Sequence, residues 1–134
     1  MLTIRKAQMA VFERIAGERF AKRLVPHIQR MWSAQCAGLT VEQIAARASD
    51  AVTRAVKWGL ESELDVARFV DLTFVFGSDF DQSQKCGWAG EILRRASIPA
   101  SERMAMLWNR ARAALRDPNQ TVELPRSSRS SGAG

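Results

Sequence analysis

Apolar residues recur along most of this chain at the three- and four-residue spacing of an α-helix, and no run alternates convincingly as a strand does. The first apolar series is Met9, Phe12, Ile15, Ala16 and Phe20. It predicts an amphipathic helix that begins near Arg5, with Thr3 in position to cap it.

Pro26 interrupts this helical pattern. Proline removes one backbone hydrogen bond and its ring collides with the preceding turn, so we expect a kink or a break near Leu24 and Val25. The apolar side of the continuation is Leu24, Ile28, Met31 and Trp32, and it should end near Gly38.

The next two helices carry their own start and stop signals. Thr40 and Gln43 have the spacing of a capping box, and Gly59 is placed to end the helix that follows. Ser62 and Asp65 form a second capping pair and open a central helix. Its apolar residues cover most of the circumference: Leu64, Ala67, Phe69, Val70, Leu72, Phe74, Val75 and Phe76. Such a helix belongs in the middle of a bundle, and Gly77 should end it.

Two shorter helical patterns follow a polar loop over 78–87. One spans 88–96, and the other begins near a capping Ser101, with Met104, Leu107, Trp108, Ala111 and Leu115 on one face. The pattern therefore predicts an all-α domain over 1–117, an irregular bundle of about five helices around a central buried helix. Residues 118–134 have little to bury and should form a disordered C-terminal tail.

Charge is segregated along the 134 residues, which carry a formal net charge of +6. The first and last segments are rich in arginine and lysine, whereas 61–81 holds most of the clustered acid. If the basic end segments fold over the acidic middle segment, part of their charge pairs within the protein. The rest would form a basic surface that attracts acidic protein, nucleic acid or anionic lipid.

Candidate catalytic residues are few. His27 is the only histidine, and Cys36 lies nine residues away at a spacing that supports no nucleophile–histidine pair. We therefore expect a protein that is not an enzyme and needs no cofactor. Asp71 lies among apolar residues in the middle of the central helix, and a buried charge needs a partner, so we expect an arginine from another helix to pair with it.

Metal binding is also poorly supported by the sequence. Asp79, Asp81 and Ser83 alternate like the start of a calcium loop, but Gln84 and Gly90 stand where that loop needs glycine and glutamate. We expect Asp79 to cap the following turn and pair with an arginine. Cys36 and Cys86 do not define a disulfide by their spacing; we expect two buried free thiols.

The start of the sequence lacks the apolar core of a secretory signal, and no apolar stretch is long enough to span a membrane, so we expect a cytoplasmic protein. The basic residues alternate with alanine, glutamate and apolar positions, which argues against nucleic acid as the main partner. Trp32, Trp58 and Trp108 are candidate anchors for a protein partner, although any of them could be core.

Four segments resemble a family of small bacterial proteins encoded in type VI secretion and polymorphic-toxin gene clusters. They are LTIRKAQM (2–9), RFAKRLVPH (19–27), ELDVARFVDLTFVFGSDFD (63–81) and WAGEIL (88–93). Together they span roughly 1–115, and the third is the most specific. Proteins of this family are encoded beside VgrG and PAAR spike proteins, effector-loading adaptors and toxic effectors.

The resemblance implies a non-enzymatic accessory protein that binds a secreted effector or its loading adaptor, as a chaperone or adaptor before export. An immunity protein that neutralises a cognate toxin is the alternative within the same class. A basic nucleic-acid-binding regulator is the alternative of another class, and its binding should weaken steeply with salt. Exposed apolar surface could equally serve a homodimer.

Overall fold

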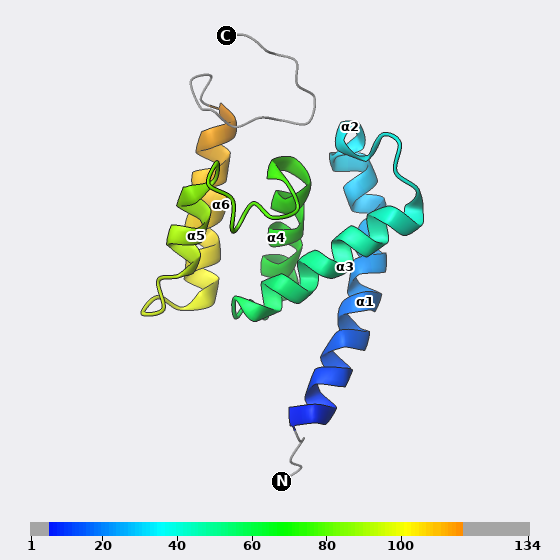
Figure 1. The fold of residues 1–134 in the computed structure, drawn as a ribbon, viewed down its shortest axis with the longest axis horizontal. Coiled ribbons are helices and arrows are strands. Elements are labelled where there is room, and N and C mark those ends of the chain that lie inside the picture. Colours follow the sequence, from blue (N-terminus) through cyan, green and yellow to red (C-terminus); the bar gives the residue numbers. More distant parts are fainter. Residues whose placement is uncertain (1–5, 117–134) are drawn as a thin grey trace.

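The computed structural model describes the backbone of residues 6–116 and the side chains from residue 16 onward, and it is helical without strands over that range (Figure 1). Its helices are α1 (Lys6–Met31), α2 (Ser33–Cys36), α3 (Val41–Lys57), α4 (Glu63–Phe76), α5 (Gly87–Leu93) and α6 (Ala100–Arg116). The predicted all-α class is confirmed. The predicted Thr3 cap and the 118–134 tail lie outside the described residues, so the 1–117 domain boundary stays a prediction.

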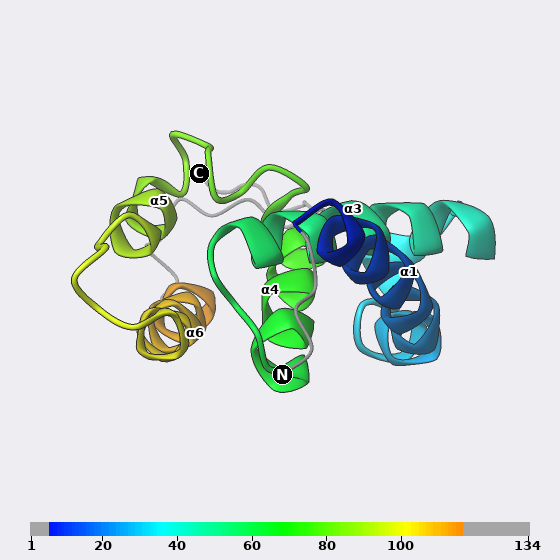
Figure 2. The same ribbon diagram turned by 90° about the horizontal axis from the view of Figure 1, so that it is seen from below.

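Helix α4 lies at the centre of the arrangement. Figures 1 and 2 show α1, α4 and α6 side by side in that order, with α3 crossing α1 and α4 on one face and α5 lying beside α6. The packed pairs include α1 with α3, α3 with α4, α4 with α6 and α5 with α6. The face opposite α3 and α5 is therefore formed by α1, α4 and α6.

The core is centred on the side of α4 that faces α3 and the loop after α4. Phe69 and Phe74 of α4 and Phe80 of that loop are almost completely buried. The rings of Phe69 and Phe80 are 5.2 Å apart between centroids. Burying each such side chain contributes about 1.5–3 kcal/mol, so these rings attach the loop firmly to the bundle.

The helix ends follow the sequence signals closely. Thr40 and Gln43 exchange both hydrogen bonds of the capping box, at 2.9 and 3.1 Å. The Ser62 hydroxyl accepts from the Asp65 amide at 3.1 Å and opens α4. Gly59 and Gly77 have φ angles of 94° and 117°, a region that residues with a side chain rarely adopt, so each lets the chain turn away from its helix.

The sequence predicted a kink or a break near Pro26. The helix does not break there, because α1 continues through Pro26 to Met31. Val25 and Ile28, on either side of Pro26, are buried in the core. Proline costs a backbone hydrogen bond and a clash with the preceding turn, and the burial of these two side chains outweighs that cost. The chain then turns at Trp32 into the short α2, and Gly38 follows with a positive φ of 86°.

Two boundaries differ from the prediction. Helix α5 ends at Leu93 instead of continuing to residue 96, and α6 begins at Ala100, so Ser101 lies inside its first turn and is not its cap. The Arg103 amide donates to the carbonyl oxygen of Pro99 at 2.9 Å, which places the start of α6 before Ser101.

Candidate functional site

An open groove runs along α4 between α1 and α6 and has a volume of about 510 Å³. The stripe that α4 contributes is Leu64, Ala67, Arg68, Asp71, Leu72 and Val75. The walls are Leu24, His27, Met31 and Trp32 on the α1 side and Trp108, Ala111, Arg112 and Leu115 on α6. Each set follows the spacing of one helix face, so three neighbouring helices present one side each to the same space.

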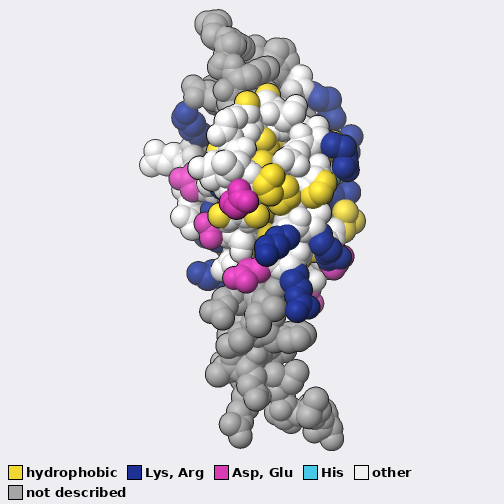
Figure 3. Space-filling view, turned by 90° about the vertical axis from the view of Figure 1, so that its right-hand side faces the viewer, with side chains coloured by type: hydrophobic (Ala, Val, Ile, Leu, Met, Phe, Trp, Pro, Cys, Tyr) yellow, Lys and Arg dark blue, Asp and Glu magenta, His cyan; other side chains and the backbone are white. Residues whose placement is uncertain are grey.

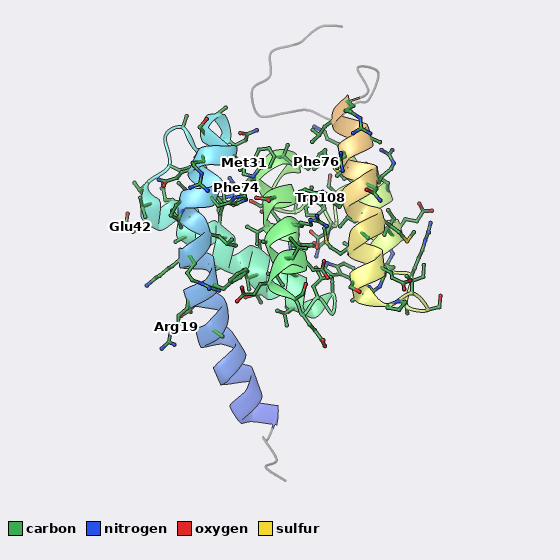
Figure 4. The ribbon with its side chains drawn as sticks, turned by 180° about the vertical axis from the view of Figure 1, so that it is seen from behind. Arg19, Met31, Glu42, Phe74, Phe76 and Trp108 are labelled. Atoms are coloured by element: carbon green, nitrogen blue, oxygen red, sulfur yellow. The ribbon has the colours of Figure 1, made fainter. Side chains whose placement is uncertain are left out.

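Figure 4 shows the groove face, with Met31 at the α1 edge and Trp108 between α4 and α6. The floor is tightly packed, since Leu72 and Val75 are each only 2% exposed. The edges are open: Leu64 is 60% exposed and Met31 56%. Leu115 is also exposed, so three of the five large apolar side chains that stand out from the described surface lie at this groove. The groove therefore gathers most of the large apolar side chains that stand out from the described surface.

Asp71 lies in the floor of the groove and joins α4 to the end of α1. Its two carboxylate oxygens are 2.9 and 3.1 Å from Nε2 of His27. The indole N–H of Trp32 donates to Oδ1 of Asp71 at 2.9 Å. The predicted arginine partner was wrong: histidine and tryptophan from α1 and its C-terminal turn satisfy this carboxylate, because α1 is the helix that packs beside this side of α4. We call His27, Trp32 and Asp71 the Asp71 cluster.

The α6 side of the groove is cationic. The guanidinium of Arg68 lies over the ring of Trp108, 5.0 Å from its centroid, which is a favourable cation–π arrangement. Arg112 is exposed one helix turn beyond Trp108. Within residues 16–116, neither arginine forms an ion pair with a carboxylate. The nearby Glu63 is already paired with Arg23 of α1 at 2.8 Å.

A second buried aspartate lies on the opposite face of the bundle. Asp81, in the loop after α4, forms an ion pair with Arg54 of α3, and it accepts a hydrogen bond of 2.8 Å from the indole N–H of Trp58. Arg54 also donates to the carbonyl oxygen of Ser78. We call Arg54, Trp58 and Asp81 the Asp81 cluster. The arginine pairing predicted for Asp79 was wrong: the Asp79 side chain is exposed, and Asp81 holds the ion pair.

The three candidate tryptophan anchors separate. Trp32 and Trp108 line the groove, whereas Trp58 lies in the Asp81 cluster and is absent from the groove lining. Trp88 packs edge-on against Phe76, with centroids 5.5 Å apart, and the guanidinium of Arg110 covers it. All four tryptophans are partly buried. The sequence alone did not show which of them would meet at one groove.

Both cysteines are free and buried, as predicted. Burial raises the pKa of the Cys36 thiol, and the positive charge of Arg47 opposes part of that rise. Burial also raises the pKa of Cys86; Asp79 adds to the rise, and Lys85 and Arg110 oppose part of it. Burial lowers the pKa of Arg47, whose guanidinium packs over Phe74 and donates to the Thr73 carbonyl oxygen at 3.0 Å.

Metal-binding and nucleophile–histidine arrangements are not formed by the described side chains. Among them, no group of three histidine, cysteine or acidic residues is arranged to hold a metal ion. His27 is engaged by Asp71 and, in this part of the chain, makes no hydrogen bond with a hydroxyl or thiol. The described helices also include none with the length and apolar character needed to cross a bilayer.

Sequence reasoning missed the groove, although α4 carried a signal for it. Arg68 and Asp71 are charged residues one turn apart in the mostly apolar middle of α4. Two polar residues one turn apart indicate a face that is not wholly core. The walls could not be predicted, because they depend on how far α1 and α6 lie from each other across α4.

The described residues form a small all-α domain with an open groove that is lined mainly by apolar side chains. No protein-family model matches the chain, and no curated protein or solved structure is significantly similar to it.

Proposed function

We propose that this protein is a non-enzymatic binding protein that holds an apolar segment of a partner protein in the groove between α1, α4 and α6. The observation that carries the proposal is the exposure of Met31, Leu64 and Leu115 along one groove whose floor is closely packed. Covering these side chains removes apolar surface from water, and the rigid floor adds little ordering cost on binding.

The resemblance to proteins of type VI secretion clusters suggests who the partner is. We propose a secreted effector or its loading adaptor, held in the cytoplasm by this protein as a chaperone or adaptor before export. An apolar groove suits this role, because an effector that is not yet assembled exposes apolar segments that would otherwise aggregate. The face seen from the α1 and α3 side mixes basic, acidic and apolar side chains and is not uniformly basic (Figure 3).

A matched pair of variants tests the proposal. Leu64 and Val41 are both exposed, at 60% and 53%, and both lie in the first turn of a helix, but only Leu64 lines the groove. Aspartate is favourable in a first helical turn, so Leu64→Asp and Val41→Asp should both fold.

The experiment is a pull-down of tagged protein from its native cells at moderate salt, identified by mass spectrometry. An effector or loading adaptor should be recovered with the wild type and Val41→Asp and depleted with Leu64→Asp. Equal recovery with all three proteins would overturn the groove as the binding site. A partner toxin whose killing is prevented, with no change in its level or export, would indicate an immunity protein instead of a chaperone.

A further inference from the structure

The groove has the dimensions of a helix. The side of α4 that lines it runs from Leu64 to Val75, and twelve residues of an α-helix cover about 18 Å, or about three turns. Two parallel helices, α1 and α6, wall this floor (Figures 2 and 4). A helix laid along α4 would complete the layer by packing its own ridge of side chains between them, as amphipathic helices do in the grooves of other proteins.

The chemistry of the lining also favours a helix over an extended segment. The groove is lined mainly by apolar side chains, and the described chain has no strand whose edge could pair with an extended peptide. An extended segment buried there would leave backbone N–H and C=O groups without partners, which costs free energy comparable to lost hydrogen bonds. A helix satisfies those groups internally and presents only its side chains.

Charge distinguishes the two walls. On the α1 side, the one carboxylate of the lining, Asp71, is already held by His27 and Trp32. On the α6 side, Arg68 and Arg112 have no carboxylate partner within residues 16–116. The stacking of Arg68 on Trp108 orients its guanidinium without neutralising it. A carboxylate on the occupant would therefore find unpaired cations at one wall only.

We propose that the groove binds an amphipathic helix of about three turns, and this inference rests on the proposed function. The apolar stripe of the bound helix packs on α4, and its single acidic edge faces Arg68 and Arg112. The apolar stripe provides most of the affinity. The acidic edge selects this occupant over other apolar helices and aligns it toward α6.

Three labelled peptide probes of equal length test this inference by fluorescence anisotropy. All carry the same leucine stripe at helical spacing; one long edge holds glutamate in the first, glutamine in the second and lysine in the third. The glutamate peptide should bind at least tenfold more tightly than the lysine peptide at low salt, with the glutamine peptide between them. The difference should shrink as salt screens the exposed charges.

Variants of the protein locate the effect. Arg68→Glu combined with Arg112→Glu should reverse the order of the glutamate and lysine peptides. Arg68→Gln is the milder second variant, in case the reversed charge disturbs packing at Trp108. Arg19→Glu is the control, because Arg19 is exposed and points away from α4 in Figure 4; it should leave the order unchanged. Circular dichroism confirms that each variant is folded.

The outcomes separate this inference from the proposed function. Equal binding of all three peptides, abolished by Leu64→Asp, would overturn the acidic edge and leave the groove as a binding site. No binding of any peptide would count against the proposed function itself. Sedimentation of the protein alone is the remaining check: a dimer that Leu64→Asp dissociates and Val41→Asp does not would assign the groove to a second copy of this chain and overturn the proposal.

Discussion

Among the described residues, Asp71 and Asp81 are buried aspartates with the same kinds of partner in two different surroundings. Each carboxylate accepts a hydrogen bond from a tryptophan indole and contacts a nitrogen-containing side chain from a neighbouring helix. The partners are Trp32 and His27 for Asp71, and Trp58 and Arg54 for Asp81. The Asp81 cluster lies on the closed face, where the side chain of Asp81 is 0% exposed. The Asp71 cluster lies in the floor of the open groove, where the side chain of Asp71 is 10% exposed and that of His27 is 35% exposed, against 24% for Arg54.

The difference shows how one bundle combines a closed face with an open one. Arginine is always charged and donates through a planar fork, so Arg54 holds Asp81 and Ser78 together and attaches the loop after α4 to α3. The Asp71 cluster, by contrast, reaches the open groove through His27, whose side chain is 35% exposed. The more buried contact is therefore in the core, and the more exposed one is at the surface that we propose to bind a partner.

The largest expected effect is the loss of the Asp81 cluster. Asp81→Ala leaves the Arg54 guanidinium without its carboxylate in a largely buried position, and removing one partner of such a pair costs about 3–5 kcal/mol of unfolding free energy. Urea denaturation followed by circular dichroism measures this. Asp79→Ala, at an exposed position two residues away, is the control and should change stability by less than about 0.5 kcal/mol.

Asp71→Ala should have a smaller effect, about 1–3 kcal/mol, because it leaves the Trp32 and His27 donors unpaired but strands no permanent charge. The same denaturation experiment gives the value. A loss equal to that of Asp81→Ala would contradict the proposed contrast between the two faces. The indole of Trp32 should also become more exposed, which fluorescence quenching by iodide reports.

The groove edge should contribute least to stability. Leu64→Asp removes a side chain that is 60% exposed and places a favourable carboxylate in the first turn of α4, so unfolding free energy should change by less than about 0.5 kcal/mol. A large loss would mean that Leu64 belongs to the core and that the groove is less open than described. A small loss of unfolding free energy together with lost peptide binding would show that Leu64 contributes to binding and not to the stability of the fold.

The fold was largely predictable from local signals, because these act within a few residues. The Thr40 capping box, the Ser62 cap and the terminating Gly77 depend on adjacent backbone groups, and all three were placed correctly. Pro26 shows the limit of local reasoning. Its cost is local, but the burial of Val25 and Ile28 that outweighs it comes from distant helices.

The site was less predictable for the same physical reason. A partner for Asp71 was expected, since a buried carboxylate requires one, but its identity depended on which helix packs beside α4. The groove itself arises from the separation of α1 and α6, and no spacing within either helix reports that separation. Trp32 and Trp108 were named as anchors on residue type alone, and the same argument also named Trp58, which the fold places in the Asp81 cluster.

The smallest expected difference concerns the two thiols. Both have a pKa above the ordinary value of 9.0, so each holds less reactive thiolate at neutral pH than a free cysteine does. Because the folded-state pKa is the higher one, the neutral thiols favour folding below about pH 9, and this contribution is lost as pH rises through the folded-state pKa. Alkylation by iodoacetamide in the native state should therefore be slow at pH 7.5 and should accelerate at higher pH than in the unfolded chain.

Between the two thiols, Cys36 should react first. Burial raises the pKa of both thiols. Arg47 opposes the rise at Cys36, and at Cys86 Asp79 adds to the rise while Lys85 and Arg110 oppose it, so the expected order rests on access to the two sites. Cys86 ends the loop that the Asp81 cluster attaches to α3, whereas Cys36 lies in the short α2 at the end of α1, so local opening should expose Cys36 more readily. Mass spectrometry of partly alkylated protein gives both rates, and Arg47→Gln should slow Cys36 alone. Faster labelling of Cys86 would place the easier opening on the Asp81 side and reverse the contrast drawn between the two faces.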